Sequence, residues 1–284
     1  MNDDQCPIIV TAAWLHSCLS DRANQDLVIV DCRFALADPT SGHQQYQIAH
    51  LPGSHYLDLN RDLSNPVGEH GGRHPLPDPA NLGEKLAAMG VNAHTLVIAY
   101  DDSRFAFAAR LWWLLRYYGH DRVAVLDGGY SNWLKAGYPV TTDLPQQSQR
   151  GNFQPQPQAD WIVDLPRVRA IQHSPTHLLI DSREPDRYLG NTEPIDPVAG
   201  HIPSAVNYPW QDVSTPDGFV LPADRQQQRW AAILPDVEPI VYCGSGVTAC
   251  ANLLSLELAG IKSAKLYPGS WSDWCSYPNL STKL

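Results

Sequence analysis

Residues 241–250 read Val-Tyr-Cys-Gly-Ser-Gly-Val-Thr-Ala-Cys, and this stretch decides the fold class. An apolar run over 239–242 ends at Cys243, and apolar and small residues resume at helical spacing over 247–259. The pattern predicts a strand, a tight loop and a helix. N–H groups of such a loop and of the first helical turn converge on the thiol, which stabilises a thiolate. We interpret Cys243 as a reactive nucleophile; the alternative is a buried thiol that only packs at the strand end.

The chain carries this pattern twice. Four segments of the first half recur in the second half in the same order, at separations of about 140 to 150 residues. The matches are 27–33 with 178–183, 50–54 with 201–205, 96–101 with 239–243, and 126–133 with 266–274. Short runs rich in Val and Ile alternate with helix-like segments, which predicts an α/β fold in each half, a small parallel sheet with helices on both faces.

The length of 284 residues also fits two domains. We expect an N-terminal domain over 1–140 and a C-terminal domain over 161–284. The segment 141–160 is rich in Gln and Pro and has little periodicity, so we expect an exposed linker there. The alternative is a loop packed on the surface.

The first half lacks the cysteine. Its matching loop, 101–104, reads Asp-Asp-Ser-Arg, so that Asp101 stands where the second half has Cys243. Ligands of parallel sheets bind beyond the carboxyl ends of the strands, where both loops fall. Because a carboxylate is not a sulfur nucleophile, we expect the N-terminal domain to be catalytically silent and to form one wall of a cleft.

The composition excludes several classes of function. The net charge is −10, and no cluster of Lys and Arg offers a site for nucleic acid or an anionic membrane. The longest apolar stretches fall far short of the ~20 residues that span a bilayer, and the acidic start at 1–4 has no signal-peptide core after it. Six cysteines without a C-x-x-C pair favour a reducing compartment. We expect a cytoplasmic protein without nucleic-acid or membrane partners.

The histidine spacings do not favour a metal site. His70 and His74 are four residues apart, but the glycines between them and the following Pro75 break the helix that would align them. His173 and His177 enclose a proline, with the same consequence. We therefore expect no metal and no cofactor.

Three residues near these motifs are interpreted as structural. His50 and His201 occupy equivalent places in both repeats although only one repeat has the cysteine, so we expect them to tie backbone segments together. Cys250 is expected to be a small core residue of the helix after Cys243. The alternative for Cys250 is a resolving disulfide with Cys243.

With the loop, the duplication and the asymmetry combined, the sequence resembles the tandem-domain rhodanese-type sulfurtransferases over nearly its whole length. The loop 243–248, Cys-Gly-Ser-Gly-Val-Thr, is similar to that of the 3-mercaptopyruvate sulfurtransferases. Members that prefer thiosulfate usually carry basic residues after the cysteine, whereas this chain has the neutral Gly244 and Ser245. The resemblance implies two rhodanese-like domains, of which the second is catalytic.

The resemblance implies a reaction in two halves. Cys243 attacks the sulfane sulfur of a small anionic donor and becomes a persulfide, releasing pyruvate, or sulfite if the donor is thiosulfate. A thiol acceptor such as thioredoxin or a small dithiol, or cyanide, then removes the sulfur. Loop amides would hold the anion, and the Ser245 and Thr248 hydroxyls would add donors. The amides expected to bind substrate belong to Gly244, Gly246, Val247 and Thr248.

The resemblance also implies a cation that holds the donor. Arg187 matches the family's substrate-binding arginine, whose two-pronged guanidinium clasps a carboxylate. Mercaptopyruvate enzymes usually have a second arginine shortly before the motif at 200–203, but residues 194–196 read Pro-Ile-Asp here. The preference between mercaptopyruvate and thiosulfate therefore stays open.

The resemblance assigns proton transfer to the first half of the chain. His74 matches a family histidine that forms a proton relay with the loop Ser245 and an acidic residue. Asp58 is a weak candidate for that acid, because an ungapped count places Asn60 there. Arg73 is expected to face the same cleft and bind the donor anion; the alternative is a solvated loop arginine.

Three other activities are weighed against a mercaptopyruvate sulfurtransferase. One is a thiosulfate:cyanide sulfurtransferase. Another is a noncatalytic persulfide carrier or sensor, which would keep Cys243 without steady turnover. The third, a rhodanese-related phosphatase, needs a longer loop and an arginine six residues after its cysteine, and position 249 is alanine. We therefore expect no phosphatase activity.

Overall fold

The computed structural model describes residues 6–21, 26–146, 149–280 and 282. The chain divides into two compact units. Unit 1 comprises Met1–Ser64, Pro77–Pro157 and Pro216–Val220, and unit 2 comprises Asn65–Leu76, Gln158–Thr215 and Leu221–Leu284. Each half of the sequence thus contributes one short segment to the unit built mainly by the other half.

The exchange of segments follows the duplication. The two exchanged segments begin 216 − 65 = 151 residues apart, which equals the separation of His201 and His50, 201 − 50 = 151. The exchange was not anticipated from the sequence, because no composition change marks 65–76 or 216–220. The domain boundaries at 140 and 161 stay a prediction.

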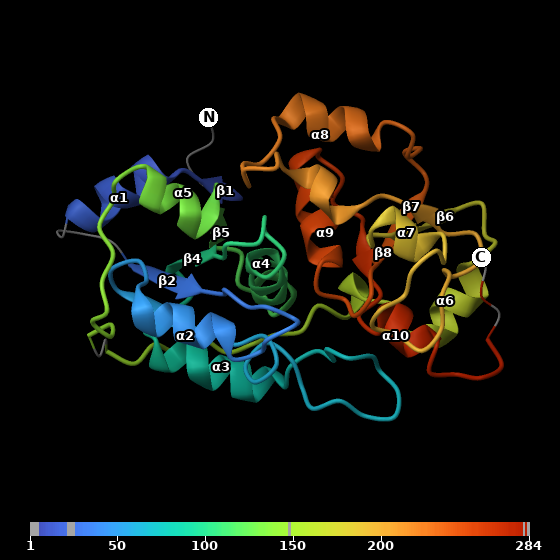
Figure 1. Ribbon diagram of the computed structural model, residues 1–284, viewed down its shortest axis with the longest axis horizontal. Helices are drawn as coiled ribbons and strands as arrows, with labels where there is room; N and C mark the ends of the chain where they lie inside the picture. The colour runs from blue at the N-terminus through green and yellow to red at the C-terminus, as the bar shows by residue number, and fades with distance from the viewer. Residues whose placement is uncertain (1–5, 22–25, 147–148, 281, 283–284) are drawn as a thin grey trace. The chain divides into compact units, whose positions relative to one another are not determined.

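Unit 1 is a parallel sheet of five strands in the order β1-β5-β4-β2-β3, with helices (Figure 1). The strands are β1 (Ile9–Val10), β2 (Leu27–Asp31), β3 (Ser54–Tyr56), β4 (Leu96–Tyr100) and β5 (Val123–Leu126). The helices are α1 (Ala12–Ser20), α2 (Ser41–Ile48), α3 (Pro79–Ala88), α4 (Ala108–Tyr117) and α5 (Gly129–Lys135).

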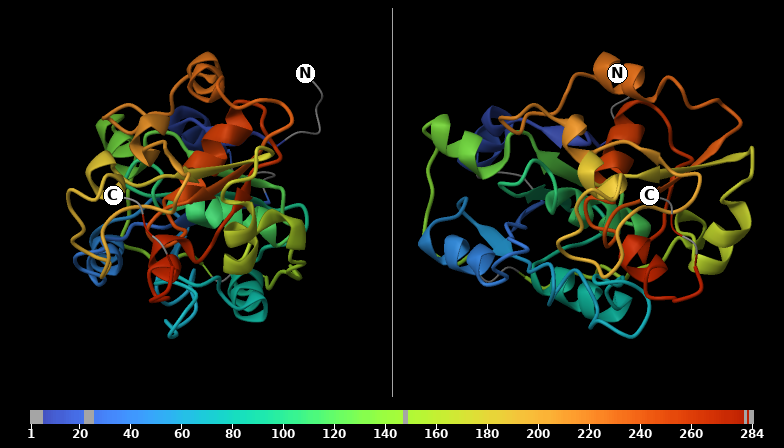
Figure 2. Two further views of the ribbon diagram at one scale, coloured as in Figure 1. Left: turned by 90° about the vertical axis from the view of Figure 1, so that its right-hand side faces the viewer. Right: turned by 45° about the vertical axis from the view of Figure 1, so that its right-hand side comes forward.

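One face of the unit 1 sheet packs against α1 and α5. Leu15 of α1 and Trp133 of α5 are fully buried in one cluster with strand residues such as Ile98. Burying an apolar side chain of this kind contributes about 1.5–3 kcal/mol. Helix α1 begins after Thr11, whose hydroxyl accepts the Trp14 N–H at 3.2 Å as an N-cap. Helices α2 and α3 lie on the other side of the strands from α1 and α5 (Figures 1 and 2).

Unit 2 repeats this plan with a parallel sheet of four strands in the order β7-β6-β8-β9. The strands are β6 (His177–Asp181), β7 (Val206–Asn207), β8 (Glu238–Tyr242) and β9 (Lys265–Leu266). The α-helices are α6 (Leu165–Ile171), α7 (Pro185–Tyr188), α8 (Ala223–Trp230), α9 (Ala249–Leu258) and α10 (Ser270–Trp274). Two 3-10 helices are η1 (Ala159–Trp161) and η2 (Trp210–Val213).

One face of the unit 2 sheet packs against α6 and α10, which corresponds to α1 and α5 of unit 1. Val168 of α6 and Trp271 of α10 are fully buried in one cluster with Ile240 of β8. Helix α9 follows β8, and every residue from Ala249 to Leu256 is buried. Among the helices of the described residues, none combines the length and apolarity needed to cross a bilayer.

Each unit holds a buried ion pair between an arginine and the aspartate that ends one strand, β2 in unit 1 and β6 in unit 2. Arg33 lies 2.6 Å from Asp31 in unit 1, and Arg183 lies 2.7 Å from Asp181 in unit 2. Tyr100, the last residue of β4, donates its hydroxyl hydrogen to Asp31 at 2.7 Å. A buried charge is tolerated only when it is paired and hydrogen-bonded, so these pairs fix the carboxyl ends of β2 and β6. The loops that carry the candidate chemistry follow the neighbouring strands β4 and β8.

Candidate active site

The Cys243 loop is the connection between β8 and α9. Cys243 is only 2% exposed. The loop is tied to the N-terminal turn of α10, because the Cys243 carbonyl accepts the Trp271 N–H at 3.0 Å and the Gly244 carbonyl accepts the Ser272 N–H at 2.9 Å. The Cys243 N–H donates to Ser270 Oγ at 3.2 Å. The nucleophile therefore sits on a loop that is anchored through its backbone.

Several N–H groups of this loop have no protein acceptor. Gly246 adopts φ +77°, and a Cβ there would lie 2.4 Å from the Pro268 carbonyl oxygen, so glycine alone fits. Successive N–H groups left unpaired in a loop before a helix form an anion-binding concavity. Within the described part of the chain, the N–H groups that donate no hydrogen bond include those of Gly244, Ser245, Val247 and Thr248.

Ser245 and His74 form a polar pair in unit 2. The Ser245 Oγ lies 2.7 Å from the Nδ1 of His74, and both residues are buried. His74 reaches this loop because the segment Asn65–Leu76 belongs to unit 2. A buried imidazole on a hydroxyl beside a thiol can pass protons to or from a reacting group.

Two arginines approach Gly244, the residue after the nucleophile. A Cβ on Gly244 would lie 3.1 Å from Nη2 of Arg73 and 3.4 Å from Nη1 of Arg187. These two nitrogens donate no hydrogen bond within the described residues. They can therefore bind an anionic group above Gly244.

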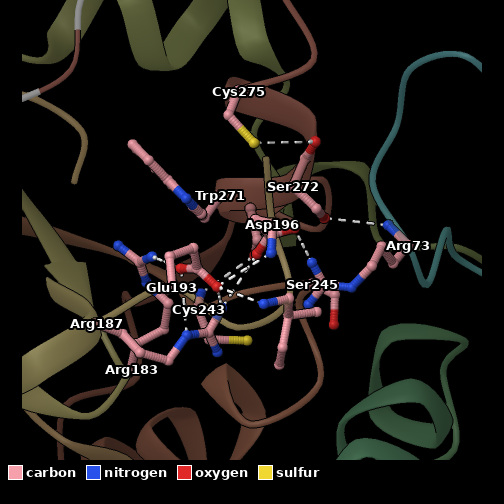
Figure 3. Close-up of polar contacts among 12 residues, drawn as sticks. Arg73, Arg183, Arg187, Glu193, Asp196, Cys243, Ser245, Trp271, Ser272 and Cys275 are labelled. Atoms are coloured by element: carbon pink, nitrogen blue, oxygen red, sulfur yellow. Dashed lines mark hydrogen bonds and ion pairs between the residues drawn. The ribbon is translucent and has the colours of Figure 1, made fainter. Parts of the chain in front are cut away.

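The other sides of the two guanidinium groups are held by carboxylates. Arg73 Nη1 donates to Oδ1 of Asp196, and Arg187 Nη2 donates to Oδ2 of Asp196 at 3.1 Å. Glu193 accepts from Arg187 at 2.7 Å and from Arg183 at 3.1 Å (Figure 3). Both carboxylates are nearly inaccessible to solvent. The arginines are thus fixed in position before any donor binds.

The electrostatic surroundings differ between the arginines. Burial lowers the pKa of Arg73; the Cys243 thiolate opposes this shift and the Arg187 charge adds to it. In Arg183 burial also acts to lower the pKa, but the ion pair with Asp181 dominates and raises it. The pKa of Arg73 is thus lowered although Asp196 pairs with it, whereas Arg183 has two carboxylate partners, Asp181 and Glu193.

The sequence-predicted residues fall into two groups. Nine lie in unit 2, and this group is Arg73, His74, Arg187, Cys243, Gly244, Ser245, Gly246, Val247 and Thr248. Asp58 lies in unit 1, where its carboxylate accepts the N–H groups of Asn60 and Arg61 at 2.9 Å each. Its pairing with His74 stays a prediction. Thr248 is half-buried and its hydroxyl makes no capping bond to α9.

Sequence reasoning missed the carboxylates of the site. Glu193 was given no role, and Asp196 was noted only where a second arginine was expected. The available signal was a pair of acidic residues within ten positions of Arg187, in a segment that the family resemblance places beside an anionic donor. Acidic residues near an anion site point to ion pairs that hold its cations.

Cys250, His50 and His201 have structural contacts. The Cys250 thiol donates to the Gly246 carbonyl at 3.4 Å, and burial raises the pKa of Cys275. As predicted, His50 and His201 bond to backbone, with Nδ1 in each case 2.7 Å from the carbonyl oxygen of a tyrosine. The described residues contain no group of three or more His, Cys, Asp or Glu able to hold a metal.

Comparison with known proteins places this geometry in a family. The family of the rhodanese-like domain matches residues 11–136 and 164–277. A probable 3-mercaptopyruvate sulfurtransferase of Pseudomonas aeruginosa is 47% identical over 276 residues, 95% of each chain. A thiosulfate sulfurtransferase of Mus musculus is 32% identical over 280 residues, 94% of this chain and 91% of its own.

A solved structure agrees with these relatives. SseA from Escherichia coli, described as a 3-mercaptopyruvate sulfotransferase with the rhodanese fold, superposes with a TM-score of 0.78 at 28% identity. The match covers 93% of this chain and 99% of that one. The predicted family, the predicted α/β fold and the predicted class of sulfurtransferase are confirmed. The chain belongs to the rhodanese-like domain family, with one such domain matched in each half.

Proposed function

We propose that this protein transfers a sulfane sulfur from 3-mercaptopyruvate, through a persulfide on Cys243, to a thiol acceptor or cyanide. One observation carries the proposal. Cys243 begins a loop in which the N–H groups of Gly244, Ser245, Val247 and Thr248 donate no hydrogen bond within the described residues. Nη2 of Arg73 and Nη1 of Arg187, which donate none there either, lie near Gly244. A nucleophile, an anion cradle and a donor-binding pair of cations therefore meet at one place.

The first half-reaction forms the persulfide. The Cys243 thiolate attacks the sulfur of mercaptopyruvate, the new S–S bond forms, and the C–S bond breaks with its electron pair going to carbon. The leaving group is the enolate of pyruvate. The thiol proton of the donor is passed to the enolate carbon, so that pyruvate and a persulfide anion result.

The arginines and the loop would stabilise different negative charges, the arginines that of the donor carboxylate and the loop that of the Cys243 sulfur. Arg73 Nη2 and Arg187 Nη1 would bind the donor carboxylate, because each has an unused N–H beside Gly244. The loop N–H groups would stabilise first the thiolate and then the persulfide. Binding the carboxylate at a fixed place aligns the donor sulfur with Cys243, and such positioning is a large part of catalysis.

The Ser245 and His74 pair would carry the proton. The 2.7 Å contact between Ser245 Oγ and His74 Nδ1 places an imidazole one hydrogen bond from the loop. In this role the pair takes the proton of the donor thiol and returns it to the enolate. Thiosulfate needs no such step, because sulfite leaves without protonation at carbon.

The second half-reaction releases the sulfur. An acceptor thiolate attacks the outer sulfur of the persulfide, and the Cys243 thiolate is the leaving group. With a dithiol such as thioredoxin, the second acceptor thiol then displaces hydrogen sulfide and a disulfide forms. Cyanide attacks in the same way and leaves as thiocyanate.

A reducing location suits this chemistry. Each of the six cysteines is a free thiol in the structure. A thiolate nucleophile must stay reduced between turnovers, which a cytoplasm with glutathione and thioredoxin provides. We therefore include a cytoplasmic location and thioredoxin as acceptor in the proposal.

The proposal is tested by comparing donors. The measurement is kcat/KM for 3-mercaptopyruvate and for thiosulfate, each with cyanide and with a dithiol as acceptor. We expect mercaptopyruvate to be preferred, because neutral residues follow Cys243 and His74 is available for the enolate. A clear preference for thiosulfate would overturn the assigned donor.

A further inference from the structure

The carboxylate of Asp196 is the only side chain among the described residues that bonds to both donor-facing arginines (Figure 3). It bonds to Nη1 of Arg73 and to Nη2 of Arg187, and so leaves Nη2 of the first and Nη1 of the second toward Gly244. The N–H of Asp196 in turn donates to Glu193 at 3.1 Å, which holds the carboxylate in place. Asp196 thus lies behind the arginine pair as seen from the loop.

The cluster around these arginines has no excess positive charge. Three guanidinium groups, of Arg73, Arg183 and Arg187, face three carboxylates, so the formal sum is 3 − 3 = 0. A Cys243 thiolate makes it −1. The carboxylates are those of Asp181, Glu193 and Asp196.

The two possible donors differ in charge. Mercaptopyruvate carries one negative charge on its carboxylate, whereas thiosulfate carries two. A buried carboxylate behind the anion site repels a dianion about twice as strongly as a monoanion at the same place. A neutral cluster with a thiolate therefore favours the monoanion, although both donors use the same two N–H groups.

We propose that Asp196 is a specificity-determining residue that disfavours dianionic donors while it positions Arg73 and Arg187. The proposal rests on the proposed function, because it assumes that these arginines bind the donor. Residues 194–196 read Pro-Ile-Asp in the region where the family resemblance implies a second arginine, and in this proposal Arg73 of the exchanged segment Asn65–Leu76 supplies the second cation instead.

The test is the ratio of kcat/KM for thiosulfate to that for mercaptopyruvate in Asp196→Asn. Any loosening of the arginines weakens the binding of the dianion more than that of the monoanion and so lowers the ratio, whereas loss of the Asp196 charge raises it. We expect the ratio to rise by at least about tenfold, because the dianion loses one more unit of repulsion than the monoanion and ~1.4 kcal/mol of that repulsion already gives a factor of ten. Circular dichroism and Tm check that the variant is folded.

Two further variants control for charge and shape. Asp196→Glu keeps the charge, and we expect its ratio to stay near that of the unmodified protein even if both rates fall. Asp236→Asn removes one charge at an exposed position just before β8, at the end of the strand opposite Cys243, and should leave the ratio unchanged.

The outcomes separate this inference from the proposed function. A ratio that is the same in Asp196→Asn and the unmodified protein overturns the role of Asp196, and so does an equal rise in Asp236→Asn. The proposed function fails by a different result, the absence of sulfur transfer from either donor by the unmodified protein.

Discussion

The loops after β4 and β8 occupy the same place in the two units but begin with different side chains. The loop of unit 1 begins with the carboxyl group of Asp101, and the loop of unit 2 begins with the thiol of Cys243. In unit 1 the Asp101 carboxylate is buried and accepts four backbone N–H groups of its own loop and of the start of α4. The donors are Ser103 at 2.9 Å, Phe105 at 3.2 Å, and Phe107 and Ala108 at 2.8 Å each. In unit 2 Cys243 replaces the aspartate, and among the described residues the N–H groups of Gly244, Ser245, Val247 and Thr248 have no such acceptor.

The two loops also differ in backbone strain. The unit 1 loop holds Arg104 at φ +57° and Phe105 at φ +73°, which costs non-glycine residues roughly 1–3 kcal/mol each. The unit 2 loop uses Gly246 at φ +77°, where the same conformation is nearly free. The bonds to Asp101 offset the strain in unit 1.

The comparison supports the proposal that this loop is suited to an anion in both units. In unit 1 the anion is a residue of the chain, so the site is filled permanently. In unit 2 the anion is proposed to be the thiolate or persulfide of Cys243, which changes during turnover. Chemistry thus depends on one side chain and its neighbours, while the strand, loop and helix are common to both units.

Removing the nucleophile is the largest change that the comparison allows. We expect Cys243→Ser to lower sulfur transfer by at least about 10⁴-fold with either donor, because a hydroxyl forms no persulfide. Thiocyanate release measures this. Cys275→Ser is the matched control: its pKa is raised by burial, and its loss should change the rate less than about twofold. Substantial turnover by Cys243→Ser would show that another residue carries the sulfur.

Loss of an arginine should have the next largest effect. Arg187→Ala is expected to lower kcat/KM by about 10²-fold, mainly through a higher KM, because a charge-assisted bond to the donor is lost. Arg187→Lys keeps the charge but not the two-pronged guanidinium, so its kcat/KM should lie between those of Arg187→Ala and the unmodified protein. The exposed Arg225 of α8 serves as control, and Arg225→Ala should behave as the unmodified protein. An Arg187→Ala variant with unchanged KM would contradict donor binding at this residue.

Changing the proton relay should give a smaller and donor-dependent effect. His74→Ala is expected to lower kcat with mercaptopyruvate by about tenfold, at the low end for an acid–base group because water also protonates an enolate. With thiosulfate the kcat of the same variant should fall by less than about threefold. The two rates are measured on one preparation, so that each donor controls the other. Equal losses would indicate that His74 only supports the loop.

Removing the Asp101 carboxylate from the unit 1 loop should have almost no effect on the reaction. Asp101→Ala is expected to lower the free energy of unfolding by about 3 kcal/mol, because four N–H groups lose a charged acceptor, and to leave sulfur transfer within about twofold. Urea unfolding measures the first effect. Asp102→Ala is the matched control, because among the described residues its exposed carboxylate bonds only to Ser131, and its loss should cost less than about 1 kcal/mol. Large loss of activity without loss of stability would assign unit 1 a catalytic part.

The duplicated α/β fold could be predicted because each repeat contains the same local sequence patterns, short apolar runs followed by a loop and a helical segment. Apolar runs such as 96–100 and 238–242 became the central strands, and the break at Cys243 became the loop. The exchange of 65–76 and 216–220 could not be predicted, because local patterns do not say which sheet a loop packs against. Asp196 could not be assigned for the same reason: its role depends on Arg73, which lies 196 − 73 = 123 residues away.

The central claim is that Cys243, and no other thiol, carries the sulfur. The most direct measurement is mass spectrometry of the protein after incubation with 3-mercaptopyruvate and no acceptor, followed by peptide mapping under nonreducing conditions. We expect one added sulfur atom per chain, on the peptide that contains Cys243, and its removal when cyanide is added. Turnover without an added sulfur, or the sulfur on any of the other five cysteines, would contradict the account.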